Sequence, residues 1–211
     1  ADWSVNEKTA MEAGLGMSYA GRRAIVCMKH VGLNVAADAF INAGVTGVNG
    51  GLLVVVADDP SMHSSQNEQD SRFYAKFALV PCLEPATQQE AYDMTREAFE
   101  FSEKLSTPVL VCLSTRISHS RARVTFAESR LRGKFKVPED FKRWTLLPTN
   151  ARPQYEKLLA KQSDFLAASE ESSFNKLSIT KGARLGVIAS GLGFNYFMEN
   201  YKEGGVECSW L

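Results

Sequence analysis

The chain of 211 residues carries 24 Lys and Arg side chains against 24 Asp and Glu, so its formal net charge at pH 7 is zero. This balance does not indicate a binding surface for nucleic acid or for an anionic membrane. With 45% hydrophobic and 23% charged residues, the composition is that of a folded domain with a sizeable core. No apolar run approaches the roughly 18–20 residues of a membrane span, and residues 1–5 lack the features of a signal peptide.

Four widely spaced cysteines without a CxxC pair are typical of a reduced, cytoplasmic protein rather than of a disulfide framework. The same spacing disfavours an iron–sulfur or zinc site in this chain, and no two histidines have metal-ligand spacing. We therefore expect no metal ligands among these residues.

The predicted elements alternate between helices and strands. In chain order we expect a helix over 6–19, strands over 23–28 and 51–57, a helix over 87–105, a strand over 109–113, a helix over 153–168 and a strand over 185–189. The strands are short, rich in Val, Ile and Leu, and non-alternating, which favours burial on both faces of a parallel sheet. The sequence therefore predicts an α/β fold, a three-layer parallel sheet with helices on both faces.

Changes in composition predict three parts of the chain. Residues 1–124 hold the first three strands, 125–182 form a connecting segment with one long helix, and 183–211 begin a further α/β domain. The first residue is not Met, and the last apolar run stops at the final residue. We therefore expect the chain to be a fragment of a longer protein.

Polar segments follow each of the first three predicted strands. They contain all the histidines of the chain and comprise residues 29–34, 58–70 and 114–119. In open α/β sheets, ligands bind beyond the carboxyl ends of the strands, so we expect these segments to line one cleft. Alternatives remain open: a hydrogen-bonded structural role for His30, a solvated loop around His63, and a basic surface segment around His119.

Glu7 admits two interpretations. Ser4-Val5-Asn6-Glu7 fits the capping box S-x-x-E, in which the Glu7 carboxylate would bond back to the Ser4 amide at the start of the first helix. On spacing alone the capping role is favoured, because the motif is common at helix starts.

Five short segments together carry a family resemblance. They are SVNEK at 4–8, MKHVGLNVAAD at 28–38, TGVNGG at 46–51, ADDP at 57–60 and HSSQNEQD at 63–70. The set closely resembles the α subunits of the indolepyruvate:ferredoxin oxidoreductases, which belong to the thiamine-diphosphate-dependent 2-oxoacid:ferredoxin oxidoreductase superfamily. The resemblance covers nearly the whole chain, and MKHVGLN followed by HSSQNEQD is its specific part.

The resemblance implies that residues 1–124 are the pyrimidine-binding (PYR) domain of a thiamine-diphosphate-binding fold. In that family a glutamate of this domain bonds N1′ of the aminopyrimidine and favours the imino tautomer, which deprotonates C2 of the thiazolium. Glu7 stands at the matching position, so the resemblance reverses the preference for a cap, although the two roles are compatible. A carboxylate beside a ring nitrogen can share a proton with it.

The resemblance also implies roles for residues behind the first two strands. Catalytic roles fall to Glu7 and His30. Cofactor contacts are implied for the residues that match the family around the first strand end: Glu7, Lys29, Gly32 and Asn34. Contacts to the substrate or to a neighbouring subunit are implied for His63, Gln66 and Asn67.

The intact enzyme implied by the resemblance oxidatively decarboxylates aryl 2-oxoacids such as indolepyruvate to aryl-acyl-CoA. It uses thiamine diphosphate, Mg²⁺ and 4Fe-4S clusters, takes coenzyme A as co-substrate and passes electrons to ferredoxin. A β subunit of the same enzyme and ferredoxin are the implied partners, and a homo-oligomer is expected. The family's Gly-Asp-Gly…Asn motif for Mg²⁺ and diphosphate, its cysteine-rich segment and an upstream GNEA-type strand are not found in this sequence.

Two alternatives stay open. The chain fits a non-catalytic α/β binding or assembly module whose polar loops form a protein interface. It also fits a related enzyme specific for pyruvate or another 2-oxoacid.

Overall fold

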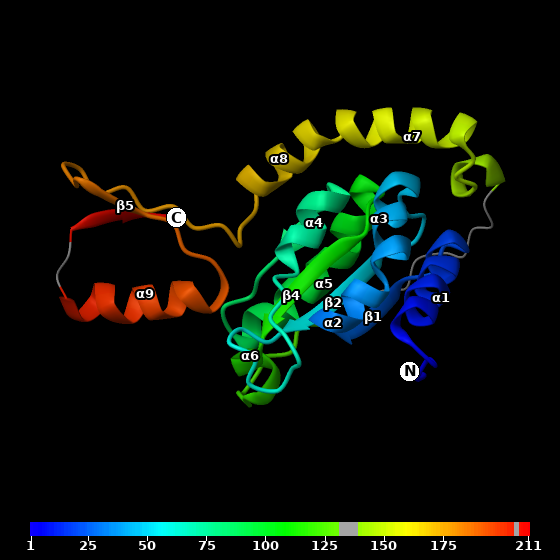
Figure 1. Cartoon of the computed structure of the whole chain (residues 1–211). Coiled ribbons are helices and arrows are strands. Elements are labelled where there is room, and N and C mark those ends of the chain that lie inside the picture. Colours follow the sequence, from blue (N-terminus) through cyan, green and yellow to red (C-terminus); the bar gives the residue numbers. More distant parts are fainter. Residues whose placement is uncertain (131–138, 205–206) are drawn as a thin grey trace.

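The computed structural model describes residues 1–130, 139–204 and 207–211 (Figure 1). Its elements follow one another in the order α1 (Glu7–Tyr19), β1 (Ala24–Lys29), α2 (His30–Val35), α3 (Ala37–Thr46), β2 (Leu52–Asp58), α4 (Arg72–Ala78), β3 (Cys82–Leu83), α5 (Gln88–Leu105), β4 (Val109–Ser114), α6 (Thr115–His119), the 3-10 helix η1 (Phe141–Trp144), α7 (Pro148–Ala160), α8 (Gln162–Glu170), β5 (Leu185–Val187), α9 (Gly191–Gly204) and β6 (Cys208–Trp210). This alternation confirms the predicted α/β class.

The first four strands form one parallel sheet within the described residues, in the order β1-β2-β4-β3. β2 lies between β1 and β4, so that Val54 is paired with both Val26 and Leu110. In β2, Leu53 and Val54 point to opposite faces, and both are fully buried. The unbroken apolar runs of β2 and β4 therefore arise from burial on both faces, as predicted.

β1 departs from the expected burial on both faces. Its side chains alternate: Ala24 and Val26 are buried, whereas Ile25 is 48% exposed and Cys27 is exposed. β1 lies at the edge of the sheet, and α5 on that face packs on β2 and β4. The prediction is therefore wrong for β1, because a helix covers only one of its faces in the described part of the chain.

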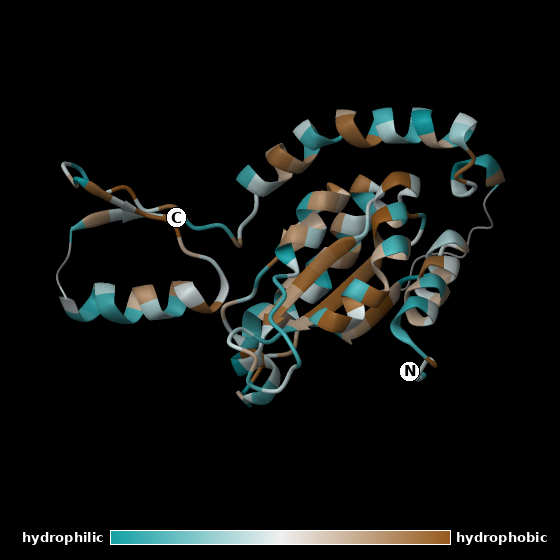
Figure 2. Ribbon diagram, viewed as in Figure 1, coloured by the Kyte–Doolittle hydropathy of each residue, from teal (hydrophilic) through white to brown (hydrophobic). Residues whose placement is uncertain are grey.

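Helices cover both faces of the sheet as a whole, which confirms the predicted three-layer arrangement. α1, α2, α3 and α4 pack on one face, where Met11, Leu33 and Phe40 are fully buried against the strands. α5 packs on the opposite face, where Ala98 meets Leu53. Figure 2 shows the strands of this sheet as the most hydrophobic part of the molecule, enclosed by helices of mixed character.

α5 matches the helix predicted over 87–105 to within one residue. Near its end, the fully buried Ser102 accepts a hydrogen bond from the backbone N–H of Leu52 at 3.0 Å. The Ser102 hydroxyl in turn donates to the carbonyl oxygen of Thr107 at 2.6 Å. Ser102 therefore links α5 to the start of β2 and to the turn before β4.

The connecting segment holds two helices in place of the single long helix predicted over 153–168. α7 and α8 meet at Lys161, whose Nζ donates to the carbonyl oxygen of Leu105 at 2.9 Å. Next to it, Gln162 Nε2 donates to the carbonyl oxygen of Leu79 at 3.2 Å. These bonds fasten the junction to the ends of α5 and α4, so the break is set by tertiary contacts that helical periodicity does not contain.

The last elements form a small unit in which β5 and β6 are parallel and α9 connects them. Trp210 of β6 lies among the rings of α9, with centroid distances of 5.6 Å to Phe194, 6.3 Å to Phe197 and 6.5 Å to Tyr201. Such a strand–helix–strand unit has the character expected for residues 183–211.

The predicted domain limits after residues 124 and 182 stay predictions. Residues 131–138 of the predicted connecting segment and 205–206 of the last part lie outside the described residues. Among the described helices, none is both long enough and apolar enough to cross a membrane.

The buried link at Ser102 gives a stability prediction. Ser102→Ala leaves the Leu52 N–H and the Thr107 carbonyl without their partner, so the free energy of unfolding should fall by about 1–3 kcal/mol. The matched control is Ser163→Ala, because Ser163 is exposed and its hydroxyl donates only to the Ala160 carbonyl. The control should change the unfolding free energy by less than about 0.5 kcal/mol. Denaturant titration of both variants checks this, and equal losses would contradict it.

Candidate functional site

α1 begins at Glu7, and the residue that caps it is Asn6. The Asn6 side chain accepts a hydrogen bond from the backbone N–H of Thr9 at 2.9 Å, and its own backbone is extended. The capping box expected from Ser4 and Glu7 is therefore wrong. Asn6 already supplies the acceptor that the box assigns to Ser4, and Glu7 is the first helical residue rather than the third.

Glu7 lies directly against Gly32 of α2. A methyl group on Gly32 would fall 2.5 Å from Glu7 Cγ and 3.0 Å from Glu7 Oε1, so a larger residue at this position would force the Glu7 side chain to move. Glu7 is half-buried, and its carboxylate makes no hydrogen bond or ion pair within the described residues. The structure thus brings together Glu7 and Gly32, and it leaves the acid unpaired.

The segment predicted as a loop over 29–34 is mostly the short helix α2, which follows β1 without a break. Its first residue, His30, is fully buried, and its Nε2 lies 2.9 Å from the carbonyl oxygen of Asn67. A carbonyl oxygen only accepts, so Nε2 carries the proton, and in the neutral ring Nδ1 is an acceptor. Nδ1 is buried without a hydrogen-bond partner in the described part of the chain. His30 therefore holds the segment after β2 through Nε2, and its Nδ1 has no partner among the described residues.

Two further bonds join the end of β1 and α2 to the segment after β2. Lys29 Nζ donates to the carbonyl oxygen of Ser64 at 2.9 Å, and Asn34 Nδ2 donates to Gln69 Oε1 at 3.2 Å. With the bond from His30, the pairs are 35 to 37 residues apart in the sequence. The first two polar segments therefore meet beyond the carboxyl ends of the strands, as predicted from the usual position of ligands in open α/β sheets.

Asp58 and Asp59, which were not among the predicted site residues, hold the segment after β2 in place through hydrogen bonds. Asp59 is buried and accepts from the Ser64 N–H at 2.7 Å and from the Thr115 hydroxyl at 2.8 Å, which adds the segment after β4 to the cluster. The bond from Ser64 lowers the pKa of Asp59 to about 2. Asp58 accepts from the Ser71 N–H and hydroxyl, and burial raises its pKa. Their position in the sequence, two adjacent acidic residues at the end of an apolar strand, could have identified both as site residues.

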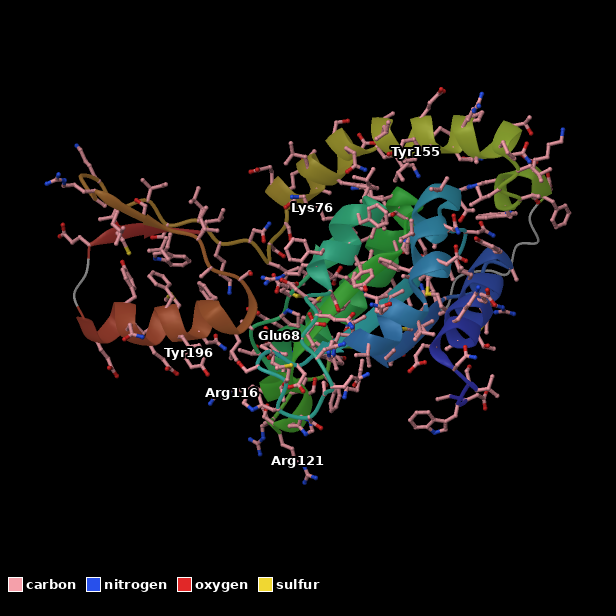
Figure 3. All side chains as sticks on the ribbon, in the orientation of Figure 1. Glu68, Lys76, Arg116, Arg121, Tyr155 and Tyr196 are labelled. Atoms are coloured by element: carbon pink, nitrogen blue, oxygen red, sulfur yellow. The ribbon has the colours of Figure 1, made fainter. Side chains whose placement is uncertain are left out.

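Other predicted site residues are less engaged. His63 and Gln66 are exposed, and Asn67 contributes its carbonyl to His30 and its side-chain oxygen to Gln69. His119 ends α6 and is exposed, in agreement with the basic-surface alternative. Figure 3 shows Glu68 and Arg116 at this same end of the sheet.

The expected cleft is replaced by loops that bond to one another. Of three cavities of about 250, 410 and 960 Å³, the 410 Å³ cavity is lined in part by Arg116 and Ile117 of the segment after β4, and neither Glu7 nor His30 lines any of the three. The surface around Glu7 is therefore half-buried and lies at the carboxyl ends of the strands. Another chain segment or domain has to cover this surface to form an enclosed site.

A parallel sheet covered by helices, with an unpaired carboxylate and polar segments at the carboxyl ends of its strands, is the arrangement of a cofactor-binding α/β domain. Residues 4–173 match the family described as "Pyruvate flavodoxin/ferredoxin oxidoreductase, thiamine diP-bdg", and the chain belongs to this family.

Three relatives are named "Indolepyruvate oxidoreductase subunit IorA". The chain is 45% identical over 214 residues to that of Pyrococcus abyssi, 42% over 211 residues to that of Methanothermobacter thermautotrophicus and 40% over 208 residues to that of Archaeoglobus fulgidus. The alignments cover 98%, 98% and 94% of this chain but only 33%, 34% and 32% of the relatives. The chain therefore spans about a third of their length.

A solved structure is also similar: "2-oxoglutarate:ferredoxin oxidoreductase from Magnetococcus marinus with 2-oxoglutarate, coenzyme A and succinyl-CoA bound". The TM-score is 0.68 at 16% sequence identity, over 98% of this chain and 44% of that one. At this identity the likeness supports the fold, a parallel α/β domain of the kind found in that enzyme.

The lowered pKa of Asp59 predicts a pH dependence of stability. Its pKa falls from 3.8 to about 2 on folding, so its contribution is present above pH 3.8 and is lost as the pH falls through this range. Asp59→Asn should therefore flatten the acid side of the melting curve. It should also lower stability at neutral pH, because the two bonds reach different carboxylate oxygens and the amide nitrogen that replaces one of them cannot accept. Melting temperatures from neutral to acidic pH check this against the exposed control Asp2→Asn, whose curve should run parallel to wild type. A parallel curve for Asp59→Asn would contradict the assignment.

Proposed function

We propose that this chain is the pyrimidine-binding part of a thiamine-diphosphate-dependent 2-oxoacid:ferredoxin oxidoreductase, with residues 1–124 as the PYR domain. The observation that carries the proposal is the Glu7 carboxylate, half-buried against Gly32 and without a partner in the described residues. The family match over residues 4–173 and the IorA relatives support it. We further propose aryl 2-oxoacids, with indolepyruvate as the type substrate, because of the names of these relatives.

The residues near Glu7 fit an aminopyrimidine. Glu7 offers a carboxylate for the ring N1′, and Gly32, which contacts it, keeps the space beside the carboxylate free of a side chain. His30, two residues before Gly32 in α2, is fully buried and has an Nδ1 without a partner in the described residues. When bound, thiamine diphosphate supplies the nucleophilic carbon and the electron sink for decarboxylation. Glu7 holds and shares the proton at N1′, and a group so positioned contributes roughly 10²–10⁴ in rate.

The neighbouring residues are proposed to hold the cofactor and the substrate. Lys29 and Asn34 would contact the cofactor from the two ends of α2 while keeping the segment after β2 in place through Ser64 and Gln69. His30, as a catalytic residue, would act through Nδ1, because its Nε2 is already bonded to the Asn67 carbonyl.

The exposed segment after β2 is proposed as the substrate side of the site. His63, Gln66 and Asn67 would contact the substrate or a neighbouring subunit there. His63 and Gln66 are exposed, so they are accessible to either one.

For the whole protein, we propose oxidation of the 2-oxoacid to aryl-acyl-CoA with coenzyme A as co-substrate and ferredoxin as electron acceptor. The Mg²⁺ and 4Fe-4S ligands would come from residues outside this sequence. A β subunit is the proposed partner, and the word "subunit" in the names of the relatives supports it. We also propose that the assembly is homo-oligomeric and cytoplasmic.

Cofactor binding separates the enzyme from a non-catalytic module. With Mg²⁺ present, thiamine diphosphate at about 100 times its dissociation constant should stabilise the assembled full-length protein by about 2.7 kcal/mol. Differential scanning fluorimetry with thiamine diphosphate and Mg²⁺, against Mg²⁺ alone, measures the shift in melting temperature. An assembly module with protein-binding loops would show no shift.

Glu7→Gln tests the site itself in the assembled enzyme. The amide keeps the size of the side chain but cannot share a proton with N1′, so turnover should fall by roughly 10²–10⁴ while folding is preserved. Exchange of the thiazolium C2 proton should slow in parallel.

Asn6→Ala is the matched control, one residue away. It removes the helix cap and should lower stability by about 1 kcal/mol, with C2 exchange unchanged. Melting temperature, turnover and C2 exchange are measured on the same preparations. Wild-type exchange in Glu7→Gln would sink the catalytic assignment.

A further inference from the structure

Two cysteine thiols lie side by side at the edge of the sheet opposite β1. Cys82 Sγ of β3 and Cys112 Sγ of β4 are 3.6 Å apart, and both cysteines are free. Cys82 pairs with Leu110, so Cys112 stands two residues further along β4 on the same face of the sheet. This separation is van der Waals contact between sulfur atoms, without a covalent bond.

The surroundings make the two thiols unequal. Cys82 is half-buried and lines the cavity of about 960 Å³, next to the Arg72 and Glu84 side chains that line it as well. Cys112 is 6% exposed and does not line this cavity. Its hydrogen bond with Cys82 and its burial both raise the pKa of the Cys112 thiol. A reagent in solution therefore meets Cys82 first, because Cys82 is the accessible thiol. Cys112 lies in contact with it, and the raised pKa makes the attack by Cys112 the slower step.

We propose that Cys82 and Cys112 are a redox-active thiol pair that a low-molecular-weight disulfide converts into an intramolecular disulfide. The Cys82 thiolate attacks one sulfur of the reagent and releases the other half as a thiol, which leaves a mixed disulfide on Cys82. Cys112 Sγ, losing its proton to the solvent, then attacks Cys82 Sγ and displaces the second half. Two protein thiols are oxidised, and one reagent disulfide is reduced to two thiols.

The position at the edge of the sheet allows the movement that this bond needs. A disulfide holds its sulfur atoms about 2.05 Å apart, so the two thiols must approach further from 3.6 Å. β3 is an edge strand of two residues that pairs with β4 at Cys82 and Leu83, next to a hydrogen bond from the Leu110 N–H to the Pro81 carbonyl. Forming the disulfide therefore needs a local adjustment of β3 and of the two side chains, and the pairing of β2 with its neighbours is not involved.

The test uses the full chain, kept reduced and then exposed to oxidised glutathione. Trypsin places each cysteine on a different peptide, since Lys or Arg separates Cys27, Cys82, Cys112 and Cys208 in the sequence. Mass spectrometry without reduction should find the Cys82 and Cys112 peptides linked, with the loss of two hydrogen atoms and no retained glutathione. Dithiothreitol should restore both thiols.

The exposed Cys27 of β1 is the internal control, because it is at the opposite edge of the sheet from Cys82. It should keep a stable glutathione adduct in the same sample. C112S should trap the mixed disulfide on Cys82, while C27S should leave the Cys82–Cys112 link unchanged. Wild-type protein that retains glutathione on Cys82 while Cys112 stays free would overturn the proposal, and this outcome does not depend on the folding of any variant.

Discussion

The parallel pairing of β2 with β1 on one side and with β4 on the other is the constraint on which the rest of the structure depends. The carboxyl ends of parallel strands lie on the same side of the sheet, so the segments that follow Lys29, Asp58 and Ser114 have to meet there. The strength of this arrangement lies in the core, since each fully buried Val or Leu contributes about 1.5–3 kcal/mol. Burial of the apolar strands therefore stabilises the sheet that positions the polar network at its carboxyl ends.

At that edge, the side chains divide between those that hold the segments and one that stays unpaired. His30, Lys29 and Asp59 use their hydrogen bonds to fasten the segment after β2. Glu7 has no such partner in the described residues, although it is half-buried against Gly32. A carboxylate that no protein donor occupies is available to a group that brings its own donor, which is the role proposed for Glu7.

The opposite end of the sheet is fastened by cations. Arg143 donates to the carbonyl oxygens of Thr46 and Val48 at 3.2 and 3.3 Å, and Lys161 does the same at the end of α5. Positive side chains at helix C-termini are favourable, because the last carbonyl groups lack helical partners. Burial lowers the pKa of both Arg143 and Lys161. The connecting helices are thereby held across the layers, and Figure 3 shows Tyr155 of α7 at the end of the sheet opposite Glu68 and Arg116.

The sequence by itself determined the α/β class, the central strands β2 and β4, helix α5 and the meeting of polar segments at one edge. These features follow from local apolar runs and from the geometry common to all parallel sheets. Four features depend on tertiary contacts: β1 is open on one face, Asn6 rather than Ser4 caps α1, the connecting helix breaks at Lys161, and Cys82 meets Cys112. Each of these depends on which distant atoms come within a few ångströms, and a one-dimensional pattern does not contain that information.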